Sequence, residues 1–161
     1  MDTLQTEKVI GYFLNSIIGK ICIEAAGDCI SHAYINNEQP QNIEIGSTAV
    51  LQEASEQLKA YFEGKLRIFT IPLRPVGTPY QQKIWTLLQE IPYGETATYK
   101  QIAARAGNPK ASRAVGMANN RNPIPIFIPC HRVIGTDGSL TGFRGGLDMK
   151  RKLLEIEGYR F

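Results

Sequence analysis

The chain has 161 residues, of which 43% are hydrophobic and 20% charged, so it can bury a core as one domain or two small ones. This composition excludes a disordered tail and a collagen-like repeat. The longest apolar stretches fall far short of the roughly 20 residues of a membrane helix. Residues 1–7 show neither the basic nor the apolar region of a secretion signal. We therefore expect a cytoplasmic protein without a membrane span.

Charge is divided unevenly along the chain. Residues 1–76 carry six Lys/Arg against nine Asp/Glu, a net charge of −3, whereas residues 77–161 carry twelve against six, a net charge of +6. A polyanion would bind the basic half. The three cysteines do not form paired C-x-x-C clusters, which favours reduced thiols over a disulfide scaffold.

Residues 1–76 predict a small antiparallel sheet covered by one helix. Strand-like runs span residues 9–14, 21–25 and 30–35, and Gly27-Asp28 supplies a hairpin turn between the last two. From residue 47, apolar side chains recur at three- and four-residue spacing until Gly64, which predicts an amphipathic helix. Residues 65–73 return to a strand-like pattern, and the prolines and glycines of residues 72–79 indicate a linker.

Residues 77–161 predict a mostly helical domain. Thr78-Pro79 with Gln81 has the pattern of a capping box, and residues 98–101 repeat it. The first helix should bury Trp85 in the core and end near residues 92–94. The second begins at residue 98 and ends at Gly107.

A third helix, which we expect Asn108-Pro109 to cap, runs through residues 111–118. Two short helices joined by residues 107–109 are typical of a helix-turn-helix, whose second helix enters a groove of DNA. The predicted fold is therefore α/β (α+β), with a sheet-plus-helix domain at 1–76 and a mostly α, winged-helix-like domain at 77–161.

A proline-rich apolar segment, residues 123–129, leads to Cys130 and His131. Its prolines exclude a helix, so we expect a stiff, extended lead-in that positions one thiol. A free thiol has a pKa of about 8.5 and is a poor nucleophile unless an imidazole or positive charge favours the thiolate. His131 and Arg132 are placed to do so. Because adjacent residues rarely point the same way, we expect a water molecule to link Cys130 to His131.

A histidine relay also needs an acidic partner that fixes the tautomer. The basic half offers six candidates, and sequence physics does not choose among them: Glu90, Glu95, Asp137, Asp148, Glu155 and Glu157. The alternative is a buried structural cysteine beside a surface histidine.

Two other clusters have simpler interpretations. Cys22, Cys29 and His32 do not reproduce the spacing of a four-ligand zinc site, so we expect no metal. Residues 150–152, Lys-Arg-Lys, are interpreted as a solvated helix face.

Residues 78–159 resemble the O6-alkylguanine-DNA alkyltransferases, also called methylated-DNA-protein-cysteine methyltransferases. The likeness rests on residues 129–133, Pro-Cys-His-Arg-Val, with Arg-Asn-Pro-Ile-Pro at 121–125, Gly-Gly-Leu at 145–147 and Glu-Gly at 157–158. Residues 1–76 match the family's amino-terminal domain only in length and in their sheet-plus-helix pattern. The resemblance implies direct-reversal repair of double-stranded DNA by a monomer that acts once and needs no cofactor.

The resemblance also implies catalytic roles. Cys130 would accept the alkyl group from O6 of guanine, and the same reaction would extend to O4-alkylthymine. His131 would draw off the thiol proton through water, and Glu157 would orient His131. Tyr99 would assist the departing guanine at N3, and Asn122 would hold the turn that carries Cys130.

For DNA binding, the resemblance implies that Arg113 fills the gap in the duplex when the damaged nucleotide is flipped out. The residues implied to surround it at the DNA are Ala111, Ser112, Ala114 and Arg121. Val133 would lend a backbone carbonyl to the base pocket, which Phe143 and Arg144 would line. Arg144 stands where the family usually has a small residue, and Phe143 lacks the hydroxyl of the tyrosine often found there.

Two alternative functions use the same residues. One is a DNA-binding regulator or damage sensor that has a helix-turn-helix and transfers no alkyl group. Non-catalytic relatives replace the acceptor cysteine, so Cys130 argues against it. The other is a cysteine hydrolase built on Cys130, His131 and Glu157, which would turn over repeatedly and would not need Arg113.

Overall fold

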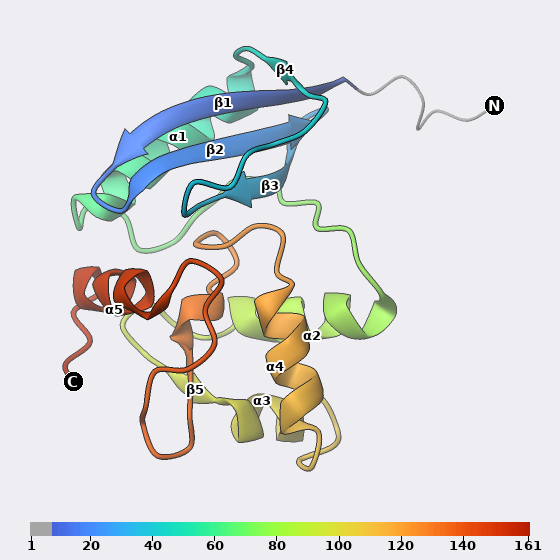
Figure 1. Cartoon of the computed structure of the whole chain (residues 1–161), viewed down its shortest axis with the longest axis vertical. Helices are drawn as coiled ribbons and strands as arrows, with labels where there is room; N and C mark the ends of the chain where they lie inside the picture. The colour runs from blue at the N-terminus through green and yellow to red at the C-terminus, as the bar shows by residue number, and fades with distance from the viewer. Residues whose placement is uncertain (1–7) are drawn as a thin grey trace. The chain divides into compact units, whose positions relative to one another are not determined.

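The structure, a computed structural model, describes residues 8–161; residues 1–7, in which the sequence shows no secretion signal, lie outside the described residues. The chain divides into two compact units, Met1–Pro75 and Val76–Phe161 (Figure 1). The division falls within the proline- and glycine-rich segment 72–79. Among residues 8–161, no helix combines the length and the hydropathy that a membrane span requires.

A four-stranded sheet forms the base of the first unit, in the order β3-β2-β1-β4. Strands β1 (Val9–Ser16), β2 (Gly19–Ala26) and β3 (Cys29–Tyr34) are consecutive and antiparallel, as predicted. Strand β4 (Glu44–Ile45) is an addition that pairs parallel to β1. It was not predicted because two exposed residues are too few to show an alternating pattern.

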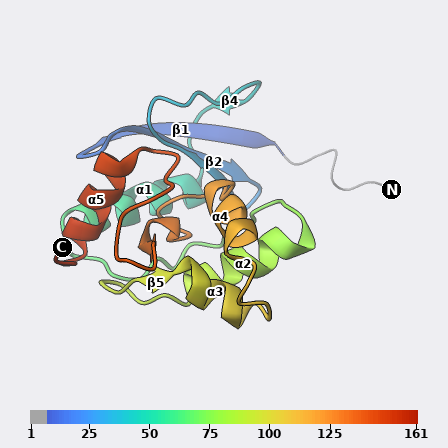
Figure 2. The same ribbon diagram turned by 60° about the horizontal axis from the view of Figure 1, so that its bottom comes forward.

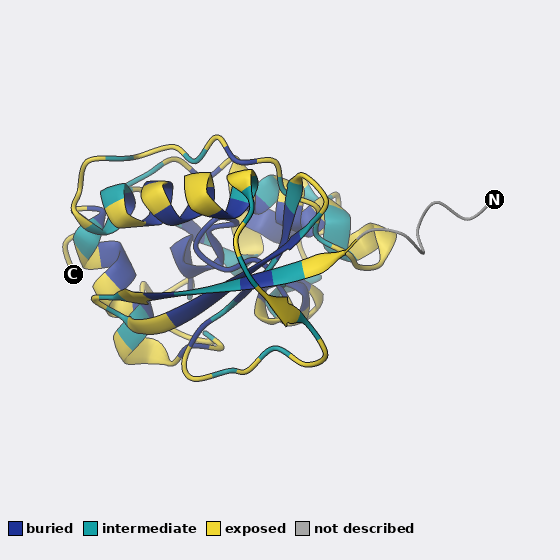
Figure 3. Ribbon diagram, turned by 90° about the horizontal axis from the view of Figure 1, so that it is seen from above, coloured by how far each residue is buried: buried dark blue, intermediate teal, exposed yellow. Residues whose placement is uncertain are grey.

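Helix α1 (Ala49–Phe62) covers one face of this sheet and contacts β1, β2 and β3 (Figure 1). Thr48 caps its start by accepting from the backbone N–H of Leu51, and Gly64, with φ of +74°, follows its end. Its buried side includes Leu58 and Tyr61, both 0% exposed, and β2 has a continuous buried run (Figure 3). The predicted sheet-plus-helix arrangement is confirmed.

Residues 65–73 do not form the strand that the sequence predicted. Only Leu73 makes a bridge, parallel to Ile30. The N–H of Ile30 donates to the carbonyl of Pro72 at 2.9 Å, and Arg74 returns a bond to the carbonyl of Ile30 at 2.8 Å. Prolines at 72 and 75 lack N–H donors, so the ladder cannot extend. The strand prediction was wrong because it considered only the side chains and not which residues have a backbone N–H to donate.

The second unit is mainly helical, and both predicted capping boxes are present. Helix α2 (Pro79–Gln89) begins with reciprocal bonds between Thr78 and Gln81. Helix α3 (Tyr99–Arg105) begins with the same pair of bonds between Thr98 and Gln101. Each box satisfies N–H groups that the first helical turn leaves without an intrahelical partner.

Helix α4 (Ser112–Asn120) packs against α3 and α2, which gives the predicted helix-turn-helix (Figure 2). Trp85 of α2 is 1% exposed, as expected of a core residue, and its indole N–H donates to the carbonyl of Ala118 at 2.8 Å. Strand β5 (Ala97–Thr98) pairs parallel to β6 (Val133–Ile134), and α5 (Leu147–Ile156) ends the unit.

Helix α4 begins later than predicted. Its N-cap is Ala111, which makes no capping bond through its side chain, so Ala111 precedes the helix. The side-chain oxygen of Asn108 instead accepts from the backbone N–H of Lys110 at 3.1 Å. Asn108 and the proline after it shape the turn between the helices, because this local bond competes with capping.

Candidate active site

Cys130 follows a folded-back loop, not the extended segment predicted for residues 123–129. Pro125 bridges to Ile128, whose N–H donates to the carbonyl of Ile124 at 2.9 Å. Ile126 has φ of +77°, a left-handed conformation that is strained for a β-branched residue. The prolines do exclude a helix, but their fixed φ is also compatible with tight turns, and here the chain turns.

Two asparagines near the end of α4 hold this loop. Asn122 donates from Nδ2 to the carbonyl of Ile128 at 2.8 Å and accepts at Oδ1 from the N–H of Ile124 at 3.0 Å. Asn119 lies with Nδ2 3.4 Å from the carbonyl of Cys130. Both side chains are buried. Sequence reasoning pointed to Asn122 and missed Asn119, which has no distinguishing motif of its own.

The thiol sits on a 3-10 helix, η2 (Cys130–Arg132), which packs against α5 and α2. Beside Cys130, the ring of His131 is 0% exposed, and its Nε2 lies 2.6 Å from Oε2 of Glu157. Of the six acidic candidates, the structure thus places Glu157, the C-cap residue of α5, against His131.

Arg132 binds the same carboxylate with two donors. Its Nε donates to Oε1 of Glu157 at 2.8 Å and its Nη2 to Oε2 at 3.1 Å, a bidentate geometry. Nη1 reaches the carbonyl of Ile91 at 2.7 Å, and the N–H of Gly94 donates to Oε1 at 3.2 Å. The carboxylate therefore has partners on both oxygens besides His131.

These contacts determine the charge states in the relay. Burial alone would raise the pKa of Glu157, but hydrogen bonds and positive charge from His131 and Arg132 lower it to about 2. Burial also lowers the pKa of His131 and outweighs the attraction of Glu157. At neutral pH the carboxylate is ionised and the imidazole is neutral, so His131 can accept a proton.

The Cys130 thiol is 4% exposed, and burial raises its pKa, although a hydrogen bond from Asn122 and the charges of Lys150 and Arg144 act in the opposite direction. The resting thiol is therefore protonated at neutral pH. Nucleophilic attack requires a base to remove its proton as the new bond forms. The water link from Cys130 to His131 stays a prediction.

Tyr99 is the first residue of α3. Its hydroxyl donates to the carbonyl of Thr141 at 2.9 Å. The ammonium of Lys150 donates to the same carbonyl at 2.7 Å and to the carbonyl of Val133 at 2.5 Å. Burial raises the pKa of Tyr99, so its hydroxyl keeps its proton at neutral pH.

Lys150 does not lie on the solvated helix face predicted for residues 150–152. Arg151 and Lys152 are exposed as expected, but Lys150 is 0% exposed. It belongs to the buried stripe of α5 with Leu153 and Leu154. Three- and four-residue spacing to these leucines was the signal that could have identified it, because it places the lysine on the apolar face.

The residues implied to contact DNA or the base are also placed by the structure. On α4, Ser112 is half-buried, whereas Arg113, Ala114 and the following Arg121 are exposed. The side chain of Arg144 donates to the carbonyl of Asn122 at 3.0 Å. Val133 is buried, with its carbonyl bound to Lys150, and Phe143 is half-buried.

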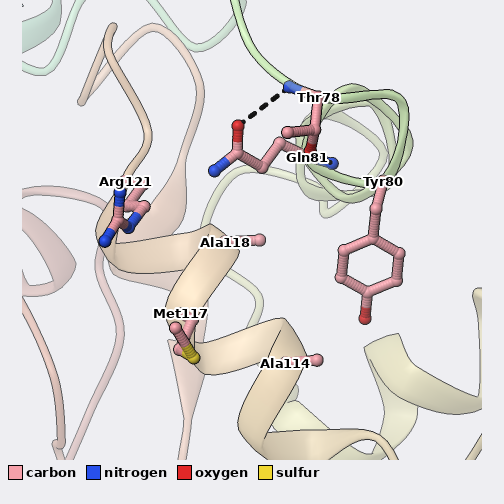
Figure 4. Close-up of a pocket in the computed structure, with 7 residues that line it drawn as sticks. All are labelled: Thr78, Tyr80, Gln81, Ala114, Met117, Ala118 and Arg121. Carbon is pink, nitrogen blue, oxygen red and sulfur yellow. Dashed lines mark hydrogen bonds between the residues drawn. The ribbon is translucent and has the colours of Figure 1, made fainter.

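A groove of about 280 Å³ lies between α2 and α4 (Figure 4). Met117 is 62% exposed there, and Tyr80 on the opposite helix is 37% exposed. The lining also includes two predicted DNA contacts, Ala114 and Arg121, but not Cys130. Within residues 8–161, no group of three or more His, Cys, Asp or Glu side chains is arranged to hold a metal ion.

Both units of the chain match known protein families. The family model described as "6-O-methylguanine DNA methyltransferase, DNA binding domain" matches residues 79–159, and the one described as "6-O-methylguanine DNA methyltransferase, ribonuclease-like domain" matches residues 11–75. The second match extends the likeness into the half where the sequence showed only a similar length and pattern. The chain therefore belongs to the 6-O-methylguanine DNA methyltransferase family, as the resemblance indicated.

Individual relatives agree with this assignment. A methylated-DNA–protein-cysteine methyltransferase of Methanosarcina acetivorans is 52% identical over 149 residues, which cover 89% of this chain and 94% of that protein. A constitutive one of Bacillus subtilis is 46% identical over 148 residues, covering 87% and 90%. A crystal structure of Mycobacterium tuberculosis OGT in complex with DNA is 42% identical, with a TM-score of 0.87 and 92% of each chain covered. The predicted mixed fold is confirmed.

Proposed function

We propose that this chain repairs DNA by transferring the alkyl group of O6-alkylguanine irreversibly to Cys130. The observation that carries the proposal is the buried array of Glu157 and Arg132 around His131, directly beside Cys130 on η2. Its family membership and its relatives, named methylated-DNA–protein-cysteine methyltransferases, support the same reaction. The carboxyl-terminal domain, residues 77–161, binds DNA and carries out the transfer, and residues 1–76 form a separate sheet-plus-helix domain.

The transfer step is a displacement at the alkyl carbon. The sulfur of Cys130 attacks that carbon, the sulfur–carbon bond forms, and the bond from carbon to O6 breaks with its electron pair left on guanine. The thiol proton passes through water to His131, and Tyr99 assists the departing guanine at N3 by hydrogen bonding or protonation. The thioether has no leaving route, so each molecule acts once and needs no cofactor. O4-alkylthymine would react by the same displacement.

Access to the base requires flipping it out of the duplex, which costs a few kcal/mol of stacking and pairing. Arg113 on the exposed side of α4 fills the vacated space. Phosphate contacts made by residues 77–161, which carry a net charge of +6, offset the remaining free-energy cost of flipping. The other proposed DNA contacts are Ala111, Ser112, Ala114 and Arg121. Val133, Phe143 and Arg144 form the base pocket, and Asn122 holds the turn. A monomer is sufficient for this reaction.

Mass spectrometry of the full chain after incubation with duplex O6-methylguanine oligonucleotide tests this proposal. We expect a gain of one methyl group, located on the Cys130 peptide, that stops at one equivalent. Cys130→Ser should gain nothing and still bind the oligonucleotide, which separates chemistry from recognition. Binding without methyl gain by the unmodified chain would overturn the proposal in favour of a damage sensor, and repeated hydrolytic turnover would favour a cysteine hydrolase.

A further inference from the structure

The turn between α2 and β5 comes into close contact with Glu157. Residues 92–95 form this turn, in which the backbone N–H of Glu95 donates to the carbonyl of Pro92 at 3.1 Å. Gly94, its third residue, has φ of +79°, the value that a type II turn needs at this position. A Cβ atom at Gly94 would lie only 3.1 Å from the backbone carbonyl oxygen of Glu157. The turn therefore needs glycine both for its conformation and for its close approach to Glu157.

Three further contacts join this turn to the proton relay. The ring of Tyr93 lies against the guanidinium of Arg132, whose central carbon is 5.8 Å from the ring centroid. The Tyr93 hydroxyl donates to the carbonyl of Ile156, the residue before Glu157, at 3.2 Å. The N–H of Gly94 donates to Oε1 of Glu157 at 3.2 Å. Tyr93 and Gly94 thus contact both members of the buried ion pair.

These contacts determine which oxygen of Glu157 faces His131. Oε1 accepts from the N–H of Gly94 and from Nε of Arg132. Oε2, which accepts from Nη2 of the same arginine, lies against Nε2 of His131. An ionised carboxylate can only accept, so the neutral imidazole carries its proton on Nε2. Nδ1 is then the ring nitrogen that can take up a proton, and the orientation of the carboxylate fixes the tautomer of the base.

We infer that Tyr93 and Gly94 are positioning residues for the proton relay, which hold Arg132 and Glu157 so that His131 keeps Nδ1 as its proton acceptor. The ring of Tyr93 restrains the guanidinium, and its hydroxyl restrains the backbone before Glu157. Gly94 restrains the carboxylate itself. The inference rests on the proposed function for its effect on the rate of alkyl transfer. The tautomer of His131, in contrast, is observable without DNA and without transfer.

The first experiment compares Tyr93→Leu with Tyr159→Leu in single-turnover methyl transfer at saturating duplex. Tyr159 is the matched control, because it is also a half-buried tyrosine of the second unit and its ring packs on Phe161. For Tyr93→Leu we expect a rate about thirtyfold lower, since a small misplacement of a reacting group is costly. The dissociation constant for DNA should stay within about twofold of that of the unmodified chain. Tyr159→Leu should change neither quantity.

Tyr93→Phe provides the rescue by a conservative variant. It keeps the ring against the guanidinium of Arg132 and loses only the hydrogen bond to the carbonyl of Ile156. A single neutral hydrogen bond contributes modestly, so its transfer rate should lie within about fivefold of that of the unmodified chain.

Nitrogen-15 NMR of the imidazole, recorded without DNA, reports the tautomer. The signals of His131 are distinguished from those of His32, the only other histidine, by their loss in His131→Gln. The unmodified chain and Tyr159→Leu should show one tautomer, protonated on Nε2, at neutral pH. Tyr93→Leu should show both tautomers. A tyrosine that only stabilised the fold would change the melting temperature and leave the tautomer as it is.

Gly94→Ala tests the same role by a second route, also if Tyr93→Leu does not fold. Gly138 is its matched control, because φ of +83° strains an alanine in the same way but a Cβ atom there meets nothing within 4 Å. Transfer by Gly94→Ala should be about tenfold slower than by Gly138→Ala, because only its Cβ presses on Glu157. Gly94→Ala should also show both tautomers of His131.

The outcomes separate this inference from the proposed function. An unmodified chain that takes up no methyl group would defeat the proposed function, while mixed tautomers in Tyr93→Leu and Gly94→Ala would still support the positioning role. Conversely, a single Nε2 tautomer in both variants, with transfer rates equal to those of Tyr159→Leu and Gly138→Ala, would overturn the positioning role and leave the alkyl transfer standing.

Discussion

Oε2 of Glu157 lies 2.6 Å from Nε2 of His131, although 26 residues separate them in the chain. The contact forms because η2, which carries His131, packs against α5, and Glu157 is the C-cap residue of that helix. Arg132 holds the same carboxylate from the adjacent position. The imidazole is therefore oriented by a carboxylate that stays ionised whether or not the ring carries a proton.

Glu157→Gln should slow methyl transfer and destabilise the protein. The change leaves the Arg132 guanidinium buried without its counter-ion, which costs about 3 kcal/mol in the free energy of unfolding. Chemical denaturation and single-turnover kinetics would measure the two effects. Glu155→Gln, on the exposed side of the same helix, is the matched control. Equal stability of the two variants would contradict this account of the buried ion pair.

The pKa of Glu157 also predicts a pH dependence of stability. Its folded value, about 2, is below the ordinary value of about 4.3. A carboxyl with a lowered folded pKa stabilises the protein above its unfolded pKa, and this contribution is lost as pH falls from about 4.3 to 2. Melting temperature should drop through that window in the unmodified chain. Glu157→Gln should show a smaller drop, and parallel curves would refute the assignment.

Arg113→Ala should reduce transfer more on duplex than on single-stranded DNA. In the proposed mechanism the arginine replaces the flipped nucleotide in a duplex, whereas a single strand leaves no stacked gap to fill. Transfer rates on both substrates, with Lys110→Ala as a nearby exposed control, provide the test. Equal losses on the two substrates would show that Arg113 contributes only charge.

Trp85→Phe should destabilise the helical unit by about 2 kcal/mol, because it removes a buried hydrogen bond and part of a packed ring. The lost bond runs from the indole N–H to the carbonyl of Ala118, and so links α2 to α4. Urea denaturation followed by circular dichroism would measure it. Tyr80→Phe, at an exposed site on α2, should change stability little; a loss as large as that of Trp85→Phe would argue against the interhelical bond.

DNA affinity should fall steeply with salt, because phosphate neutralisation by the +6 half releases counter-ions. A plot of log affinity against log salt concentration gives the slope. Arg121→Ala should make that slope shallower by about 1 if the side chain contacts one phosphate. Lys59→Ala, in the acidic first unit, should leave it unchanged. A flat salt response would count against electrostatic binding.

Features set by local chemistry could be predicted from the sequence. The capping boxes at Thr78 and Thr98, the hairpin at residues 27–28 and the core position of Trp85 all follow from neighbouring residues. The thiol motif and the choice of Glu157 depended on resemblance to a family, because nothing local connects Glu157 to a residue 26 positions away.

The predictions that the structure contradicts failed because they depend on backbone donors and tertiary contacts, which neighbouring residues do not reveal. Residues 65–73 have strand-like side chains, but prolines interrupt the backbone donors that a ladder needs. The folded loop before Cys130 and the burial of Lys150 depend on tertiary hydrogen bonds, from Asn122 in one case and to two carbonyls in the other. Residue type alone identified Lys150 as a surface lysine, although its spacing along α5 placed it on the buried stripe.

The burial of Cys130 has a consequence for the lifetime of the protein between encounters with damage. A thiol that is 4% exposed, with a raised pKa, presents little thiolate to peroxides or to small electrophiles. A protein that reacts only once must still carry an unmodified thiol when it meets its substrate. In the proposed mechanism, the desolvation that makes deprotonation of Cys130 depend on His131 thus also protects the unreacted thiol from modification.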